Sequence, residues 1–301
     1  MTTEAPVLPT ATPTRGRRFA TWLYAYPGAQ LRLLLGGPLG WMALVYFGSL
    51  FVLLLSAFWA KDAFTGLVVP FDWSLAAFEA LLGNEVYRTI AVRTIGIAAL
   101  VTVTDAIIAF PIAYYMARLA SPRLRALLVV AVLMPLWAAY LVKIYAWRTI
   151  LQGNGPADWL LGFFGLPGPG LDALTNSWLV FSYLWLPYMI LPIYAGLERI
   201  PNSLLEASAD LGARAGMTFR RIVLPLVFPA LVAGSIFTFS LTLGDYIVPD
   251  LVSDAKFIGN VIYDNSNLGN PPLAAAYALL PIAIMVVYLA VARRLGAFES
   301  L

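Results

Sequence analysis

Side chains able to do covalent chemistry are scarce in this 301-residue chain, which contains no cysteine and no histidine. Their absence removes disulfides, thiol nucleophiles, histidine general bases and the usual zinc ligands. Carboxylates alone could still hold a metal, but the remaining carboxylates, lysines and hydroxyls form no evident nucleophile–base pair or cluster. A Gly-x-x-x-x-Gly-Lys-Ser/Thr loop for binding phosphates is also missing. We therefore predict no catalytic residue, no metal site and no cofactor bound by this chain.

A charged stretch, EASADLGARAGMTFRRIVLP at 206–225, lies between two apolar runs. Residues 201–203 before it are typical of a helix start, and apolar side chains recur at helical spacing over 204–211. Gly212 and Gly216 are predicted to interrupt this helix and to permit a sharp turn. A second helix then leads into the next apolar run. The simplest interpretation is a basic helix lying on anionic lipid at the membrane surface.

Two acidic residues fall inside or near the end of apolar runs. Asp105 lies in VTVTDAIIAF, and Asp245 is followed by Tyr246 in LGDYIVPD. Intramembrane carboxylates are costly and usually face a polar cavity or a partner. Together with an aromatic face they would suit the ammonium groups of a di- or polyamine, so Asp245, Tyr246 and Asp105 are our candidates for a substrate pathway. The alternatives are a packing feature around Asp245 and a structural hydrogen bond from Asp105 to Thr102 or Thr104.

The elements that would position these residues are membrane spans. The chain is 61% hydrophobic and 12% charged, whereas soluble domains carry about 25% charged residues. A spanning helix needs about 20 apolar residues, and six stretches qualify: 38–60, 91–117, 126–147, 176–197, 226–249 and 274–292. We expect an all-α polytopic membrane protein with a six-span domain over 37–301, preceded over 1–36 by a disordered cytoplasmic tail and an interfacial segment. Gly244 and Pro249 could unwind the fifth span around Asp245.

The distribution of basic residues predicts the orientation of these spans, because lysine and arginine concentrate on the cytoplasmic side. Most of the arginines, including those of the loop at 198–225, fall on the same side as both termini. Both termini are therefore expected in the cytoplasm. The outer loops are net acidic and could attract a cationic solute. Equally, aspartate and asparagine could serve there only as turn formers.

The spacing of the charged loop resembles the EAA motif of ABC importer permeases. The matching residues are Glu206, Ala207, Gly212, Ile222, Leu224 and Pro225, with Ser208 in place of the second alanine. The resemblance implies that Glu206, Ala207, Ser208 and Gly212 belong to a cytoplasmic coupling helix that docks on a separate ATPase subunit. Leu224 and Pro225 would then set the return of the chain into the membrane.

A wider resemblance, over roughly 88–295, is to the spermidine/putrescine-type branch of these permeases. It is carried by FRRIVLPLVFPALVAGSIFTFSLTLGDYIVPDLV, IGNVIYD and WRTILQGNGPADWLL. It implies the type I (MetI-like) importer architecture, a bacterial inner-membrane location, and transport of polyamines or of another solute of the branch, such as ferric iron or sulfate. The implied partners are an ATPase dimer that binds ATP and Mg²⁺, a second homologous permease and an extracytoplasmic solute-binding protein, with no nucleic acid.

Two other functions compete with this interpretation. In an ion-coupled secondary transporter, Asp105 and Asp245 could form a proton relay. A membrane-embedded hydrolase would need a nucleophile–base pair or a metal cluster, and the sequence offers no evident one.

Overall fold

The computed structural model describes residue 24 and residues 27–62, 64–165 and 172–294. The chain divides into two compact units, 1–55 and 56–301. Most of the predicted cytoplasmic tail and interfacial segment lies outside the described residues, and the boundary at residue 37 stays a prediction.

The first unit contains one apolar helix with a π-helical turn in its middle, formed by α2 (Pro27–Met42), η1 (Ala43–Phe47) and α3 (Gly48–Ser56). Its span-like part is Leu34–Ser56, so the span predicted at roughly 38–60 is confirmed but begins and ends earlier in the chain. The helix stops early because Trp59 already belongs to a strand. Trp41 and Leu44 are 72% and 74% exposed, as expected for side chains that face lipid.

The second unit begins with a hairpin that the prediction of an all-α chain did not include. Strand β1 (Trp59–Lys61) pairs antiparallel with β2 (Val68–Trp73). Asp62 shapes the connection, because its Oδ1 accepts the backbone N–H groups of Phe64 and Thr65 at 2.8 and 2.7 Å. These hydrogen bonds lower the pKa of Asp62, and the one from Thr65 has the largest effect. Asp62 is therefore a turn former.

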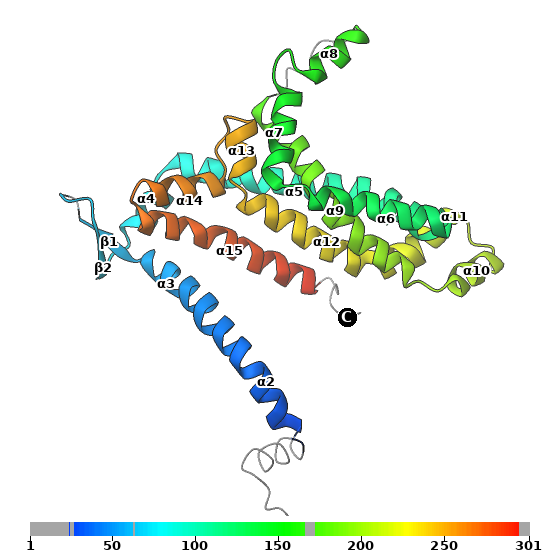
Figure 1. Cartoon of the computed structure of the whole chain (residues 1–301), viewed down its shortest axis with the longest axis horizontal. Helices are drawn as coiled ribbons and strands as arrows, with labels where there is room; N and C mark the ends of the chain where they lie inside the picture. Colours follow the sequence, from blue (N-terminus) through cyan, green and yellow to red (C-terminus); the bar gives the residue numbers. More distant parts are fainter. Residues whose placement is uncertain (1–23, 25–26, 63, 166–171, 295–301) are drawn as a thin grey trace, which may run out of the picture. The chain divides into compact units, whose positions relative to one another are not determined.

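The remaining elements of the second unit are helical (Figure 1). In chain order they are α4 (Ala76–Gly83), α5 (Glu85–Tyr114), η2 (Tyr115–Leu119), α6 (Pro122–Trp137), α7 (Tyr140–Leu151), α8 (Pro156–Phe163), α9 (Ala173–Glu198), α10 (Asn202–Asp210), α11 (Ala215–Thr218), η3 (Phe219–Val223), α12 (Leu224–Gly244), α13 (Ile247–Val252), α14 (Ile258–Asn267) and α15 (Pro271–Arg294).

Helices α5, α9 and α12 lie side by side and form the centre of this unit (Figure 1). Buried side chains from all three helices, such as Ala113, Ile193 and Val227, make one apolar core. The helices approach closely where residues are small. A Cβ on Gly196 would lie 2.6 Å from the Cβ of Ala230, so α9 and α12 can meet at this point only because residue 196 is glycine.

The third predicted span, 126–147, is not one straight helix. Helices α6 and α7 meet at an angle of 92° across the extended residues Ala138 and Ala139. Tertiary packing explains the bend, because Ile144 of α7 is buried in a cluster with residues of α9 and α13. Among the described residues, five helices are long and apolar enough to span a membrane, or six if this bent pair counts as one span.

The fifth predicted span, 226–249, ends as a continuous helix at Gly244. Asp245 has extended backbone, and the short helix α13 follows, so the predicted break at this position is confirmed. The start of α14 packs against the break. A Cβ on Gly259 would lie 2.7 Å from the carbonyl oxygens of Gly244 and Asp245, which explains glycine there.

Candidate functional site

The charged loop forms the helix–turn–helix that its sequence predicts. Helix α10 begins at Asn202 and follows directly from the end of α9 (Figure 1). Glu206 and Ala207 are exposed, whereas Ser208 is buried, and its hydroxyl lies 2.7 Å from that of Thr218. Gly212 has a φ of +75°, a left-handed conformation that L side chains rarely adopt. Its place at the sharp turn is confirmed.

The second half of the loop differs from the prediction at one glycine. Gly216 lies inside the short helix α11 and does not interrupt a helix. A glycine outside the left-handed region carries no turn of its own, so Gly212 makes the turn alone. The π-helical turn η3 follows α11, and Leu224 and Pro225 then open α12 as predicted.

One apolar residue of the loop stands out by its exposure. Leu211, beside the turn at Gly212, is 88% exposed, although its helical spacing with Leu204 and Ala207 predicts a packed stripe. Leu204 is also exposed, at 43%. The side of α10 that would be buried in an ordinary amphipathic helix is thus left open in the isolated chain.

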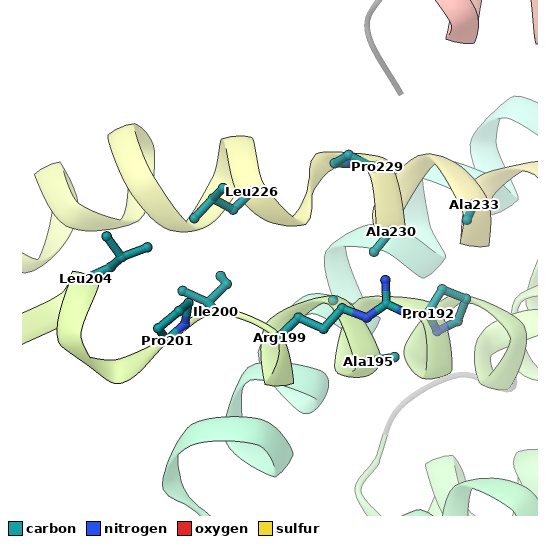
Figure 2. A pocket seen from close by; sticks show the side chains of 11 residues that line it. Pro192, Ala195, Arg199, Ile200, Pro201, Leu204, Leu226, Pro229, Ala230 and Ala233 are labelled. Atoms are coloured by element: carbon teal, nitrogen blue, oxygen red, sulfur yellow. The ribbon is translucent and has the colours of Figure 1, made fainter. Parts of the chain in front are cut away.

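An apolar cavity of 400 Å³ lies where α9, α10 and α12 meet. Figure 2 shows Leu204 of α10 and Leu226 of α12 on its walls, with Pro192 and Arg199 from the end of α9. The cavity directly adjoins the close contact between Gly196 and Ala230. Helices α9 and α12 are therefore in close contact at Gly196 and are further apart next to α10.

Asp245 occupies the break after α12, and its carboxylate has three hydrogen-bond donors. Oδ1 accepts the backbone N–H groups of Ile247 and Val248 at 2.8 and 2.9 Å, which caps α13, and Oδ2 accepts the hydroxyl of Tyr140. The side chain is half-buried. Asp245 thus has a structural role here, and Tyr140 is a neighbour that sequence reasoning missed, because it lies 105 residues away.

Tyr246 extends an aromatic surface beside this carboxylate. Its ring stacks on that of Tyr263 with a centroid distance of 4.3 Å and an angle of 14° between the planes. The side-chain amide of Asn260 donates to the Tyr246 carbonyl oxygen at 2.9 Å and fixes the backbone. Tyr140, whose hydroxyl donates to Asp245, stacks on Trp185. Aromatic residues therefore lie next to the half-buried carboxylate in the chain and in space.

Asp105 lies in the middle of α5 and is fully buried. Neither carboxylate oxygen has a hydrogen-bond partner among the described residues, and the same holds for the hydroxyl of Ser182 on α9. The alternative of a bond to a neighbouring threonine is wrong, because Thr102 bonds to the Ala98 carbonyl oxygen and Thr104 accepts from Trp178. No hydrogen bond joins Asp105 to Asp245.

Several acidic residues of the loops that are predicted to lie outside have local partners. Besides Asp62, Asp172 accepts a hydrogen bond from Thr175. The Nζ of Lys256 lies 3.1 Å from Oδ2 of Asp264 and 3.5 Å from Oδ1 of Asp250. Both contacts raise the pKa of Lys256, and the contact with Asp264 has the larger effect. The turn-forming interpretation therefore accounts for several of them. In the part of the chain that the structure describes, no group of three or more acidic residues is placed to hold a metal ion.

The arrangement of long apolar helices around an exposed loop helix agrees with a family match. Residues 98–298 match the model of the binding-protein-dependent transport system inner membrane component. The chain belongs to this family of ABC importer permeases. Its sequence is 50% identical over 291 residues to the inner membrane ABC transporter permease protein YdcU of Escherichia coli (strain K12), which covers 91% of this chain and 92% of the relative.

More distant relatives of this permease carry a solute in their names. The spermidine/putrescine transport system permease protein PotB of Haemophilus influenzae is 31% identical over 218 residues, 69% of this chain and 76% of the relative. Among solved structures, a chain of a bacterial alginate ABC transporter in complex with an alginate-bound periplasmic protein superposes with a TM-score of 0.69 at 17% identity. That alignment covers 91% of the permease and 97% of the other chain, and it establishes the shared fold.

Proposed function

We propose that this permease is the membrane subunit of an ATP-driven importer for a di- or polyamine such as putrescine or spermidine. The observation that carries the transport mechanism is α10, a short helix with exposed Glu206 and Ala207, which is followed by exposed Leu211 and the left-handed turn at Gly212. Exposed apolar surface on a loop helix is typical of a docking element. Small residues would allow this helix to sit deep in a groove of the ATPase, where Glu206 could meet basic partners.

Energy would come from the partner and not from this chain. ATP and Mg²⁺ would bind to an ATPase dimer, and closure of that dimer would move α10 on the cytoplasmic side, where both termini would also lie. The movement would reach the spans and rock this permease against a second, homologous one, which gives alternating access by rigid-body motion. An extracytoplasmic binding protein would deliver the solute to the opposite face.

The choice of a polyamine is supported by the names of relatives such as PotB and by the chemistry of the break after α12. Asp245 offers a half-buried carboxylate that accepts a hydrogen bond from Tyr140, which stacks on Trp185, and the next residue, Tyr246, stacks on Tyr263. An ammonium group is attracted both by the charge and by the faces of such rings. A sulfate would be repelled by the carboxylate and would gain nothing from the rings.

Asp105 would act at a different stage of the cycle. In the conformation described here it is sealed between α5 and α9, so no solute can reach it. A buried carboxylate without a partner is costly, and a movement that separates these helices would relieve that cost and expose the group. We therefore place Asp245 at the entrance of the pathway and Asp105 in a part that opens during transport.

The test is reconstitution of the complete importer in proteoliposomes, with the ATPase, the second permease and the binding protein. ATP-dependent uptake of labelled putrescine or spermidine, not displaced by sulfate or ferric iron, is the expected result. Glu206→Lys should abolish uptake while ATP hydrolysis continues, because only the contact with the ATPase is changed. Glu79→Lys, the same substitution on the exposed outer helix α4, is the control and should transport normally. Full uptake by Glu206→Lys would contradict the docking role.

A further inference from the structure

Helix α10 has few attachments to the long helices, although it must move them. Ser208 is its buried residue, and the hydroxyl of Ser208 lies 2.7 Å from that of Thr218, which connects α10 to α11 and so to α12. Leu205 packs at the edge of the core between α5, α9 and α12. The third attachment is an arginine that comes from a different part of the chain.

Arg118 reaches across the joint between α9 and α10 from the π-helical turn η2, which continues α5. Its Nη1 donates to Oδ1 of Asn202, the first residue of α10, at 2.7 Å. Its Nη2 donates to the carbonyl oxygen of Ile200 at 2.6 Å and to that of Leu197 in the last turn of α9. One guanidinium therefore holds both sides of the joint. Figure 2 shows this joint at Ile200 and Pro201.

A second arginine anchors the same turn of η2 from the start of α6. The Nε and Nη2 of Arg125 donate to the carbonyl oxygens of Met116 and Ala117 at 3.0 and 3.1 Å. Its Nη1 lies 3.3 Å from Oε1 of Glu198 at the end of α9. The two arginines thus donate to carbonyl groups at helix ends, and they join η2, α6, α9 and α10 into one network.

We propose that Arg118 is a positioning residue that transmits the movement of α10 to α5. The proposal rests on the proposed docking of α10 on the ATPase. Hydrogen bonds from a charged, planar guanidinium are strong and directional, so η2 must follow when the joint turns. Without Arg118, α10 would keep its connection to α12 through Thr218 and the packing of Leu205, but it would lose the hydrogen bonds that join it to η2 at the end of α5. ATP hydrolysis would then continue with little transport.

The experiment compares the wild-type importer with Arg118→Ala, Arg118→Lys and the control Arg123→Ala, which removes an exposed arginine of α6 outside the network. ATP hydrolysis and solute uptake are measured on the same proteoliposomes. Arg118→Ala should lower the solute carried per ATP by about tenfold, within the usual range of coupling between sites. Arg118→Lys should restore only part of it, because an ammonium group cannot hold three acceptors in a fixed plane. Arg123→Ala should match the wild type.

Hydrogen exchange of this chain in lipid nanodiscs tests whether Arg118 holds the joint between α9 and α10, without any solute or ATPase. Arg118→Ala should speed exchange in the last turn of α9 and in α10, with α15 unchanged. Unchanged exchange in α10 would overturn the proposal. So would an equal loss of uptake and ATP hydrolysis, which indicates a merely structural role. If the wild-type importer carries no polyamine, the proposed solute is wrong. The hydrogen-exchange result then still tests whether Arg118 positions α10.

Discussion

Single residues of the loop show how a spacing pattern becomes geometry. Gly212 occupies the left-handed region, and Ser208, at the place where the motif usually has alanine, is buried against Thr218. A hydroxyl at this position adds a hydrogen bond that alanine could not make. The departure from the motif therefore strengthens the link between the two halves of the loop.

Gly212→Ala should strain the turn by about 1 kcal/mol, because an L residue resists a φ of +75°. We expect reduced transport per ATP with normal membrane insertion. Gly216→Ala is the matched control, since Gly216 lies in α11 with nothing within 4 Å of an added Cβ. Uptake and ATP hydrolysis by the two variants provide the comparison. Equal activity of both would show that the conformation of the turn is unimportant.

Asp245→Asn should lower the transport of a cationic solute, because it removes the charge while one side-chain oxygen can still cap α13. We expect a raised KM for uptake. Tyr140→Phe, which removes the hydroxyl donor and keeps the ring, separates this effect from the loss of the hydrogen bond. Asp254→Asn, at an exposed outer acid, serves as the control. An unchanged rate at limiting solute would remove Asp245 from the pathway.

At the scale of elements, the contact between α5 and α9 combines tight packing with unsatisfied polar groups. Ala113 and Met189 belong to the shared core, while Asp105 and Ser182 lie on the facing surfaces without hydrogen-bond partners in the described part of the chain. Such a contact is less stable than an apolar one. This favours an interface that separates during the cycle.

Asp105→Asn should leave thermal stability about unchanged, because an amide of the same size replaces a carboxyl group that forms no hydrogen bond with the described residues. Transport should nevertheless fall, since the exposed state of the pathway loses a carboxylate. Thermal unfolding in detergent and uptake in proteoliposomes measure the two effects. A clear loss of stability would show that Asp105 has a partner.

The contribution of the junction between α13 and α14 to the stability of the fold should depend on pH in the alkaline range, because Lys256 titrates there. The hydrogen bond to Asp264 is the main cause that raises the pKa of folded Lys256 above 10.5. The ion pair therefore stabilises the fold fully below pH 10.5, and this stabilisation is lost as the pH rises through the pKa of the folded state. The side chain is 48% exposed, so the gain over Lys256→Gln should be only about 1–2 °C in Tm. Thermal scans of both proteins between neutral and strongly alkaline pH test this. A difference that persists above the transition would contradict the role of the charge.

At the scale of the whole molecule, membership of the ABC importer permeases defines the transport mechanism but not the transported solute. The family match covers residues 98–298, whereas relatives with different names share the same fold. A fold of this kind supports many solutes, because the solute is chosen by a few side chains along the pathway.

The source of energy provides a test at this scale. Proteoliposomes that contain this permease without its ATPase should show no uptake under an imposed pH gradient, and addition of ATP to the complete importer should start it. The control is the complete importer without ATP. Uptake driven by the pH gradient alone would support the secondary transporter with Asp105 and Asp245 as a proton relay.

The sequence by itself determined the apolar stretches that are long enough to span a membrane and the loop helix with its turn. These features depend on local composition and short spacings, which are visible in one stretch of chain. The start of α10 at Asn202 and the turn at Gly212 follow from a few neighbouring residues.

Only the tertiary structure decided which distant residues meet. The hydrogen bond from the Tyr140 hydroxyl to Asp245 and the hydrogen bond from Arg118 to Asn202 join segments far apart in the chain. The 92° bend between α6 and α7 and the burial of Asp105 also depend on the helices packed against them. Arg118 and Asn202 are 84 positions apart, and no local pattern records that α5 and α9 run side by side. Packing of small residues brings the helices together, and the polar contacts follow from that packing.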